Sequence, residues 1–307
     1  MDAQRKGIQG ETYVEFIVAP DGHPRMPRIL YSLPGGYFEE YVRESVMRST
    51  YLPARINGEP ITASTSMMYH FVVDHANIGD YGNLESRVNE TKHKAEAGDA
   101  SAQMLYGMML AGLPQLKQTY DKALPWFLKA AQAGSPYAQY QIGTGLLNGR
   151  GCQCDSVKGE IWLEKAAQSD QSDAQVSLAE YLLKGKPTTE ATQGALVWLE
   201  RAVKQDNASA KLMLSSILAA NPIADIRDPA RALALTDGMQ HIYKEDPSFW
   251  EIRAAAFASR ADYNAATKAQ SQALSEAARL QWDLAPLQQR AALYASHQPW
   301  RGDLLNF

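Results

Sequence analysis

One fixed period runs through the middle of the sequence and constrains the fold more than any other feature. Four alanines stand 36 residues apart, at Ala102, Ala138, Ala174 and Ala210. Two further columns keep the same step, namely Trp126, Trp162 and Trp198, and the small residues Ala123, Gly159 and Ala195. A repeat of this length indicates a solenoid, in which each helical unit buries its apolar face against its neighbours.

Apolar residues recur at helical spacing within each period. The pattern predicts first helices at Ser101–Ala111, Pro136–Leu147, Asp173–Leu183 and Ala208–Ala219. It predicts second helices at Asp121–Gln132, Ser156–Gln168 and Thr192–Lys204. We expect the small columns to let the backbones approach, and the tryptophans to lie in the core between one helix pair and the next.

These repeats carry motifs that are specific enough to name a family. The segments SAQMLYGMMLAG, YAQYQIGTGLLNGRGCQCDSVKGEIWLEKAAQ and DAQVSLAEYLLKGKPTTEATQGALVWLERAV show an Ala-x-x-x-x-Gly step, a Gly-x-Gly turn and a Trp followed by an alanine pair. They resemble Sel-one-like repeats, which are relatives of tetratricopeptide repeats. The third and fourth units depart from the pattern, because Ala179 and Ser215 replace the glycine of the first step.

After Ala220 the period decays at Asn221–Pro222, and a new helix is predicted over Pro229–Tyr243. Five positions then match the columns of a tetratricopeptide-like unit, namely Trp250, Ala254, Phe257, Ala266 and Ala273. A last helix over about Leu284–Ser296 is expected to cap the solenoid.

The first 75 residues follow a different pattern. Alternation predicts strands at Glu11–Val18, at about Met26–Ser32 with a break at Pro27, and at Ile61–Val73. A helix is predicted over Phe38–Ser49. The tight turn after the first strand makes a hairpin, and the helix then returns the chain. The strand order is therefore 2-1-3, with Ile61–Val73 on an open edge.

This unit resembles the C-terminal domain of TonB, the periplasmic energy transducer of Gram-negative bacteria. The resemblance rests on VEFIVAPDG, on FEEYVRESV and on YLPARINGEPI, in which Pro53, Ala54, Gly58 and Pro60 keep the family spacing. One aromatic residue that is usual near the end of the helix is replaced here by Ser49 or Thr50.

The resemblance implies that the last strand accepts an extended segment of an outer-membrane receptor by strand addition. The predicted partner-binding residues are Ile61, Thr62, Ser64, Ser66, Met68 and His70 on the strand, with Arg55 and Asn57 in the loop before it. For Arg55 and Asn57, ordinary turn chemistry is the favoured interpretation. Two such edges could also pair across a two-fold axis, which predicts a possible homodimer.

These patterns divide the chain into four parts. Residues 1–75 form the TonB-like domain, 76–98 a linker and connecting helix, 99–220 the Sel-one-like repeats, and 221–307 the tetratricopeptide-like helices and cap. The predicted fold class is an α+β domain, with a three-stranded antiparallel sheet and a helix, followed by an all-α solenoid. The connecting helix is expected at about Leu84–Glu96.

Charge and composition exclude several partners. The net charge is −4 at pH 7, so no global basic field attracts nucleic acid or anionic lipid. No apolar run approaches the length of a membrane span. Because the sequence begins just ahead of a strand, we expect that a leader or a membrane anchor has been removed from a longer product.

The sequence offers little catalytic chemistry. The two cysteines, Cys152 and Cys154, lie in one turn without a second ligand pair, and the six histidines have no metal spacing. Neither a nucleophile motif nor a nucleotide-binding loop occurs. We therefore expect no enzyme, no metal site and no cofactor.

The leading hypothesis is a periplasmic adaptor that binds proteins through the edge strand and through the concave face of the solenoid. One alternative is the soluble part of an anchored TonB-type transducer for outer-membrane transport, which an upstream membrane helix and a Pro-rich spacer would support. A third possibility, an envelope enzyme of peptidoglycan or β-lactam chemistry, lacks a serine–lysine motif.

Overall fold

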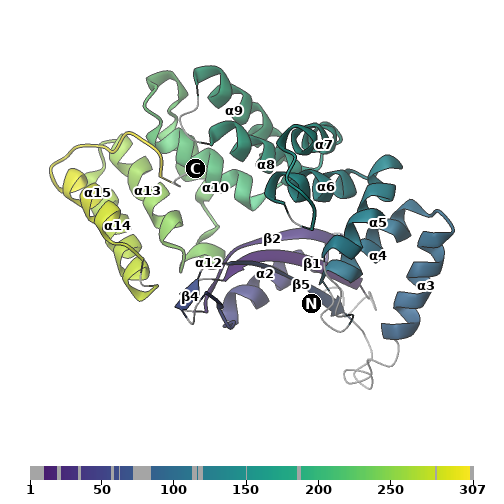
Figure 1. Cartoon of the computed structure of the whole chain (residues 1–307). Helices are drawn as coiled ribbons and strands as arrows, with labels where there is room; N and C mark the ends of the chain where they lie inside the picture. The colour runs from purple at the N-terminus through teal and green to yellow at the C-terminus, as the bar shows by residue number, and fades with distance from the viewer. Residues whose placement is uncertain are drawn as a thin grey trace.

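The computed structural model describes most of the chain. The described ranges are residues 10–18, 22–33, 36–56, 59–61, 63–71, 84–112, 116, 120–149, 151–184, 188–280 and 282–304. They form a small sheet domain followed by an array of paired helices (Figure 1). The predicted fold class is confirmed.

The sheet has three strands in the order β2-β1-β5. They are β1 (Gly10–Val18), β2 (Pro24–Leu33) and β5 (Ala63–Phe71). Both β2 and β5 pair antiparallel with β1, so the predicted order and the predicted edge position of the last strand are correct. The prediction that Pro27 breaks the second strand is wrong. The pairing of β2 with β1 instead shifts register between Glu15 and Ile17, and such an irregularity on an edge strand tolerates a proline, which has no N–H to donate.

The third strand differs from its predicted extent. Ile61 belongs to a separate two-stranded hairpin of β3 (Ala54–Ile56) and β4 (Glu59–Ile61), in which it pairs with Ala54. The strand that joins the main sheet begins at Ala63, so alternation alone did not separate the two elements. Val72 and Val73, the predicted end of the strand, lie outside the described residues.

One face of the sheet is covered by α2 (Glu39–Arg48). Val14, Phe16 and Val18 project from this face of β1 and pack against Val42 and Val46 of the helix, and all five are nearly inaccessible to solvent. The helix begins after Phe38, whose ring stacks on Phe71 with centroids 4.0 Å apart. The alternation of β1 therefore sets the small core of this domain.

The array follows the predicted helices within a few residues. Its helices are α3 (Leu84–Glu96), α4 (Ala100–Gly112), α5 (Tyr120–Gln132), α6 (Pro136–Asn148), α7 (Ser156–Gln168), α8 (Ser172–Leu183), α9 (Thr189–Lys204) and α10 (Ala208–Ala220). The glycine step permits close packing. A Cβ atom on Gly143 would lie 2.8 Å from Cγ of Leu163, and one on Gly107 would lie 2.8 Å from the ring of Phe127.

Further columns, which the sequence analysis did not single out, repeat with the same period. Three buried glutamines donate to the carbonyl eight residues earlier, at the end of the preceding helix, namely Gln103 to Ala95, Gln139 to Ala131 and Gln175 to Ala167. The turns before α4, α6, α8 and α10 each contain one residue with left-handed backbone, namely Gly98, Gly134, Asp170 and Asp206. These contacts fix the angle between successive helices, because they satisfy the carbonyls that a helix end leaves unpaired.

The last part of the chain contains α11 (Pro229–Thr236), α12 (Gln240–Tyr243), α13 (Pro247–Ser259), α14 (Tyr263–Arg279) and α15 (Ala285–Ala295). The predicted helix over Pro229–Tyr243 is therefore two helices, separated at Gly238, whose φ of 80° ends the first one. A buried ion pair links α13 to α15, in which Arg290 Nε donates to Glu251 Oε1 at 2.6 Å.

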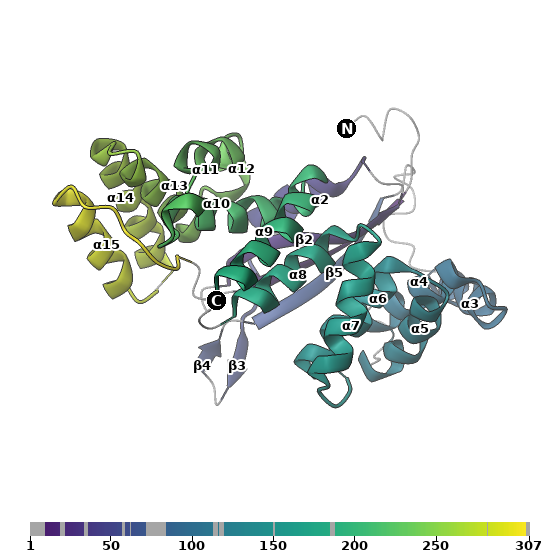
Figure 2. The same ribbon diagram turned by 90° about the horizontal axis from the view of Figure 1, so that it is seen from above.

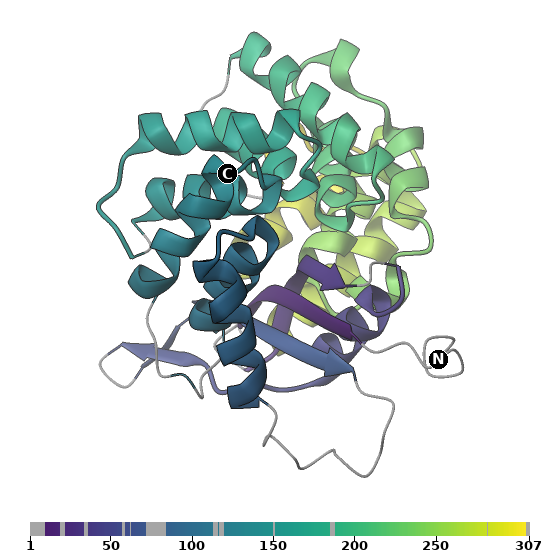
Figure 3. The same ribbon diagram turned by 90° about the vertical axis from the view of Figure 1, so that its right-hand side faces the viewer.

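The helices of the array form an arch, and the sheet domain lies beneath it (Figure 1). Seen from above, α8, α9 and α10 cross over the strands (Figure 2). The side view also places the strands below the array (Figure 3). The sheet is thus a middle layer, with the array on one face and α2 on the other.

Candidate functional site

The candidate site is the outer edge of β5. This strand pairs with β1 from Ala63 opposite Val18 to Phe71 opposite Gly10. Within the part of the chain that the structure describes, no strand pairs with its other edge. An unpaired edge of nine residues presents a row of backbone donors and acceptors to another extended segment.

The predicted partner-binding residues do not form one surface. Ser64, Ser66, Met68 and His70 lie on β5, opposite Ile17, Glu15, Tyr13 and Glu11. Ile61 and Arg55 lie instead in the β3–β4 hairpin, where Arg55 pairs with Pro60 and is exposed. Thr62 and Asn57 lie outside the described residues. The role of all eight residues in partner binding stays a prediction.

Met68 points toward the array. It lies opposite Tyr13, and both side chains pack on the apolar cluster formed by the first repeats. Tyr13 is only 3% exposed, so the array, and not α2, buries this face of β1. The face of β5 on which Met68 lies is consequently turned toward the molecule's own repeats.

The opposite face of β5 is exposed at Thr65 and Met67, while Tyr69 and Phe71 are partly buried against the core beneath α2. Four residues of β5 alternate onto it, namely Thr65, Met67, Tyr69 and Phe71, and we call these four together with Tyr41 of α2 the β5 ledge. Met67 is 38% exposed and Tyr41 is 45% exposed. The Tyr41 ring meets Phe71 edge-on at 5.8 Å. The sequence analysis did not identify the ledge, although the alternation of β5 already separated its two faces.

Tyr51 closes the inner side of the ledge. Its ring lies 4.7 Å from that of Phe16, and burial, together with the neighbouring Tyr69, raises the pKa of its hydroxyl above the usual range. Tyr51 is therefore neutral at physiological pH.

The concave face of the array holds the sheet domain. Met47 of α2 packs on the apolar cluster of the later repeats, while Tyr13 and Met68 pack on that of the first repeats. Tyr243 of α12 is fully buried near Arg43 and Glu40 of α2. The chain's own domain therefore occupies part of this face, and the expectation that the face also binds a separate protein stays a prediction.

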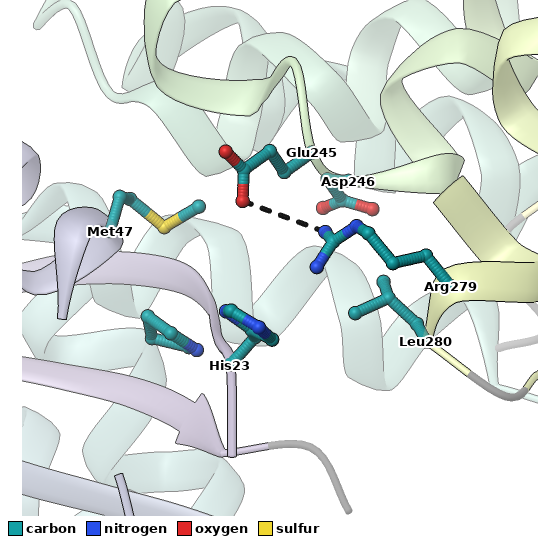
Figure 4. A pocket seen from close by; sticks show the side chains of 7 residues that line it. His23, Met47, Glu245, Asp246, Arg279 and Leu280 are labelled. Atoms are coloured by element: carbon teal, nitrogen blue, oxygen red, sulfur yellow. Dashed lines mark ion pairs between the residues drawn. The ribbon is translucent and has the colours of Figure 1, made fainter. Parts of the chain in front are cut away.

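A small pocket lies between the two parts of the molecule (Figure 4). It is lined by His23 and Met47 on the sheet side and by Glu245, Asp246 and Arg279 on the array side. Arg279 pairs with Glu245 at 3.5 Å. The space at its centre is about 10 Å³, which is about what one water molecule requires. The pocket is therefore part of the contact between domains and not a substrate site.

The tryptophan column lies at the border of the core and not inside it, contrary to expectation. Each of the three rings is partly buried against the repeat clusters. A cation covers each ring from three residues further on, with Lys129 at 4.4 Å from Trp126, Lys165 at 4.6 Å from Trp162 and Arg201 at 5.0 Å from Trp198. The cation screens the exposed side of the ring, which stabilises the outer surface of the array.

The described residues show no other chemistry. They contain no group of three potential metal ligands. Cys152 and Cys154 are free thiols; Cys152 is partly buried and Cys154 is exposed. No helix that the structure describes combines the length and apolarity required to cross a membrane.

Comparisons with known families define the two modules. Residues 1–73 match the model of the Gram-negative bacterial TonB protein C-terminal. Residues 100–135, 136–170 and 172–207 each match the Sel1 repeat. Both resemblances found in the sequence are confirmed. Residues 1–73 are thus similar to a Gram-negative envelope module and residues 100–207 to Sel1 repeats, and both kinds of module are typical of protein–protein interaction.

Two solved structures are similar to parts of the chain. A Sel1 repeat protein from Oxalobacter formigenes is 18% identical, with a TM-score of 0.48, over 71% of this chain and 96% of that protein. A protective antigen of uropathogenic Escherichia coli strains with an SLR fold is 19% identical, with a TM-score of 0.42, over 68% of this chain and 55% of that protein. No curated protein matches the chain.

Proposed function

We propose that this protein is a non-enzymatic periplasmic adaptor that captures an extended segment of a protein partner on the open edge of β5. The observation that carries the proposal is the strand order, because it leaves one edge of β5 without a partner strand in the described residues. Main-chain pairing supplies affinity in this mode of recognition, and the alternate side chains supply specificity.

The array has a supporting role in this proposal. Its concave face packs on the sheet domain at Met47, Tyr13 and Met68, so we assign it the task of holding β5 in a fixed orientation. The partner would be an envelope protein, since the TonB C-terminal family belongs to the Gram-negative envelope. An outer-membrane receptor is the partner that the family resemblance favours.

Site-specific photo-crosslinking in the full chain tests the proposal. A photoreactive amino acid at Met67 is expected to crosslink one extended segment from an envelope extract, identified by mass spectrometry. The matched control carries the same amino acid at Val197, which is 60% exposed on α9. Crosslinks at Val197 without any at Met67 would contradict the proposal and assign binding to the outer face of the array.

Two proline variants test the main-chain pairing. Successive N–H groups of β5 point alternately toward β1 and toward the open edge. One of Thr65→Pro and Ser66→Pro therefore removes only an outward donor. That variant is expected to keep its thermal unfolding transition and to lose capture of the segment. If both variants fold and both keep capture, main-chain pairing is excluded.

A further inference from the structure

The two faces of β5 are not equivalent, and their difference bears on what can bind beside it. On the array side, Met68 is partly buried against the first repeats, and α4 lies next to the strand. On the other side, α2 packs mainly on β2 and β1. The face of β5 that carries Thr65 and Met67 is therefore left exposed.

A segment added to the edge would lie about 4.8 Å from β5. Its side chains would alternate between the two faces, and each would be about 5 Å from its neighbour across the strands. Those on the α2 side would lie beside Met67 and Phe71, with Tyr41 above them. Met67 and Tyr41 together offer partly exposed, largely apolar surface.

We infer that the partner segment carries apolar or aromatic side chains at alternating positions, i, i+2 and i+4, which pack on the β5 ledge. This inference rests on the proposed function and adds the chemistry of the partner to it. The occupant is an extended peptide of another protein. Its alternating side chains bury Met67 and Tyr41, while its backbone completes the pairing of β5.

The ledge predicts a preference that the backbone alone does not provide. Pairing with the edge is indifferent to side-chain order, whereas packing on the ledge requires the apolar residues to share one face. Three favourable cross-strand contacts of ordinary strength correspond to about a tenfold difference in affinity. The order of residues in the partner is therefore the quantity to vary.

Fluorescence anisotropy with the full chain and two labelled peptides measures this preference. The first peptide alternates valine and threonine over nine residues between terminal lysines. The second, which we call the blocked peptide, has the same composition in successive pairs, Val-Val-Thr-Thr-Val-Val-Thr-Thr-Val, so that no two of its valines stand at i and i+2 on one face. The alternating peptide is expected to bind about tenfold more tightly. A version with every second amide N-methylated tests whether binding uses the backbone.

Substitutions in the β5 ledge test whether the peptide binds there. Met67→Glu and Tyr41→Glu are each expected to weaken the alternating peptide and to leave the blocked peptide nearly unchanged. Val197→Glu is the matched control, because Val197 is exposed on α9 and distant in sequence from the ledge. Thermal unfolding of every variant confirms that it is folded before binding is compared.

Each outcome decides between the two proposals. If both peptides bind equally, lose binding on N-methylation and ignore Met67→Glu, the edge is used but the ledge inference is overturned. If neither peptide binds the folded protein, the proposed function itself fails. A dimer that Met67→Glu dissociates, seen by analytical ultracentrifugation, would assign the ledge to a second copy and would also overturn the inference.

Discussion

The repeat array and the sheet domain are stabilised in different ways. In the array, contacts are local and recur, as when Gly143 packs on Leu163 and Gln139 reaches the carbonyl of Ala131. In the sheet domain, the central pairing joins β1 to a strand that follows a helix and a hairpin, and Tyr13 is buried only because the array covers it. Each repeat of the array is therefore stabilised by its neighbouring repeats, whereas the sheet domain depends in part on its contact with the array.

The largest expected loss of stability comes from a substitution in the core of the array. Leu163 is fully buried between α6 and α7, and Leu163→Ala leaves a cavity that costs about 3 kcal/mol of unfolding free energy. Denaturant unfolding measures the loss. Hydrogen exchange should increase first in α6 to α8, because each repeat depends on its neighbours.

Leu128→Ala is the control for this substitution. Leu128 is 39% exposed on α5, so its truncation should change stability by only a few tenths of a kcal/mol. Equal losses for the two variants would show that burial in the repeat core does not decide the stability of the array.

A smaller effect tests the glycine step. A methyl group on Gly143 would lie 2.8 Å from Leu163 Cγ and 3.0 Å from its backbone nitrogen. Gly143→Ala should therefore cost about 2 kcal/mol by overpacking. Gly194→Ala should have the opposite sign and stabilise by about 0.5–1 kcal/mol, because the new Cβ would meet only Leu182 at 3.5 Å. Thermal unfolding compares the two, and destabilisation by both would show that α9 is packed as tightly as α6.

The smallest expected change in stability comes from a substitution at the contact between the array and the sheet domain. The hydroxyl of Tyr243 is buried beside α2 and has no hydrogen-bond partner within the described structure. Tyr243→Phe removes an unsatisfied polar group and should stabilise the protein by about 1 kcal/mol. Tyr120→Phe is the control of opposite sign, because the Tyr120 hydroxyl donates to Gln141 Oε1 at 2.8 Å. Destabilisation by Tyr243→Phe would indicate a partner for this hydroxyl in solution.

The sequence predicted the array well because its constraints are local. The helices fell within a few residues of their predicted bounds, since the Ala and Trp columns repeat at a fixed step. The helix over Pro229–Tyr243 was divided wrongly, because one left-handed residue, Gly238, ends α11. The glutamine column was present in the sequence too, but polar residues are not part of an apolar pattern.

The candidate site was predicted only in outline. The connections of the sheet placed β5 at an edge, because a hairpin and a helical return leave few alternatives. They did not show that the array would cover the face with Met68, since docking of one domain on another leaves no periodic signal. The same contact decided which face of β5 remained open, and so the ledge around Met67 became visible only in the structure.

The position of the sheet domain also has a mechanical consequence. It contacts α4 near one end of the array, and α10 and α12 toward the other. A solenoid bends most easily along its length, but here the sheet domain spans the inside of the curve and contacts helices toward both ends. Flattening the array would separate Met68 or Met47 from its apolar cluster. The curvature of the repeats is therefore set by a contact across the arch as well as by the packing of each repeat on the next.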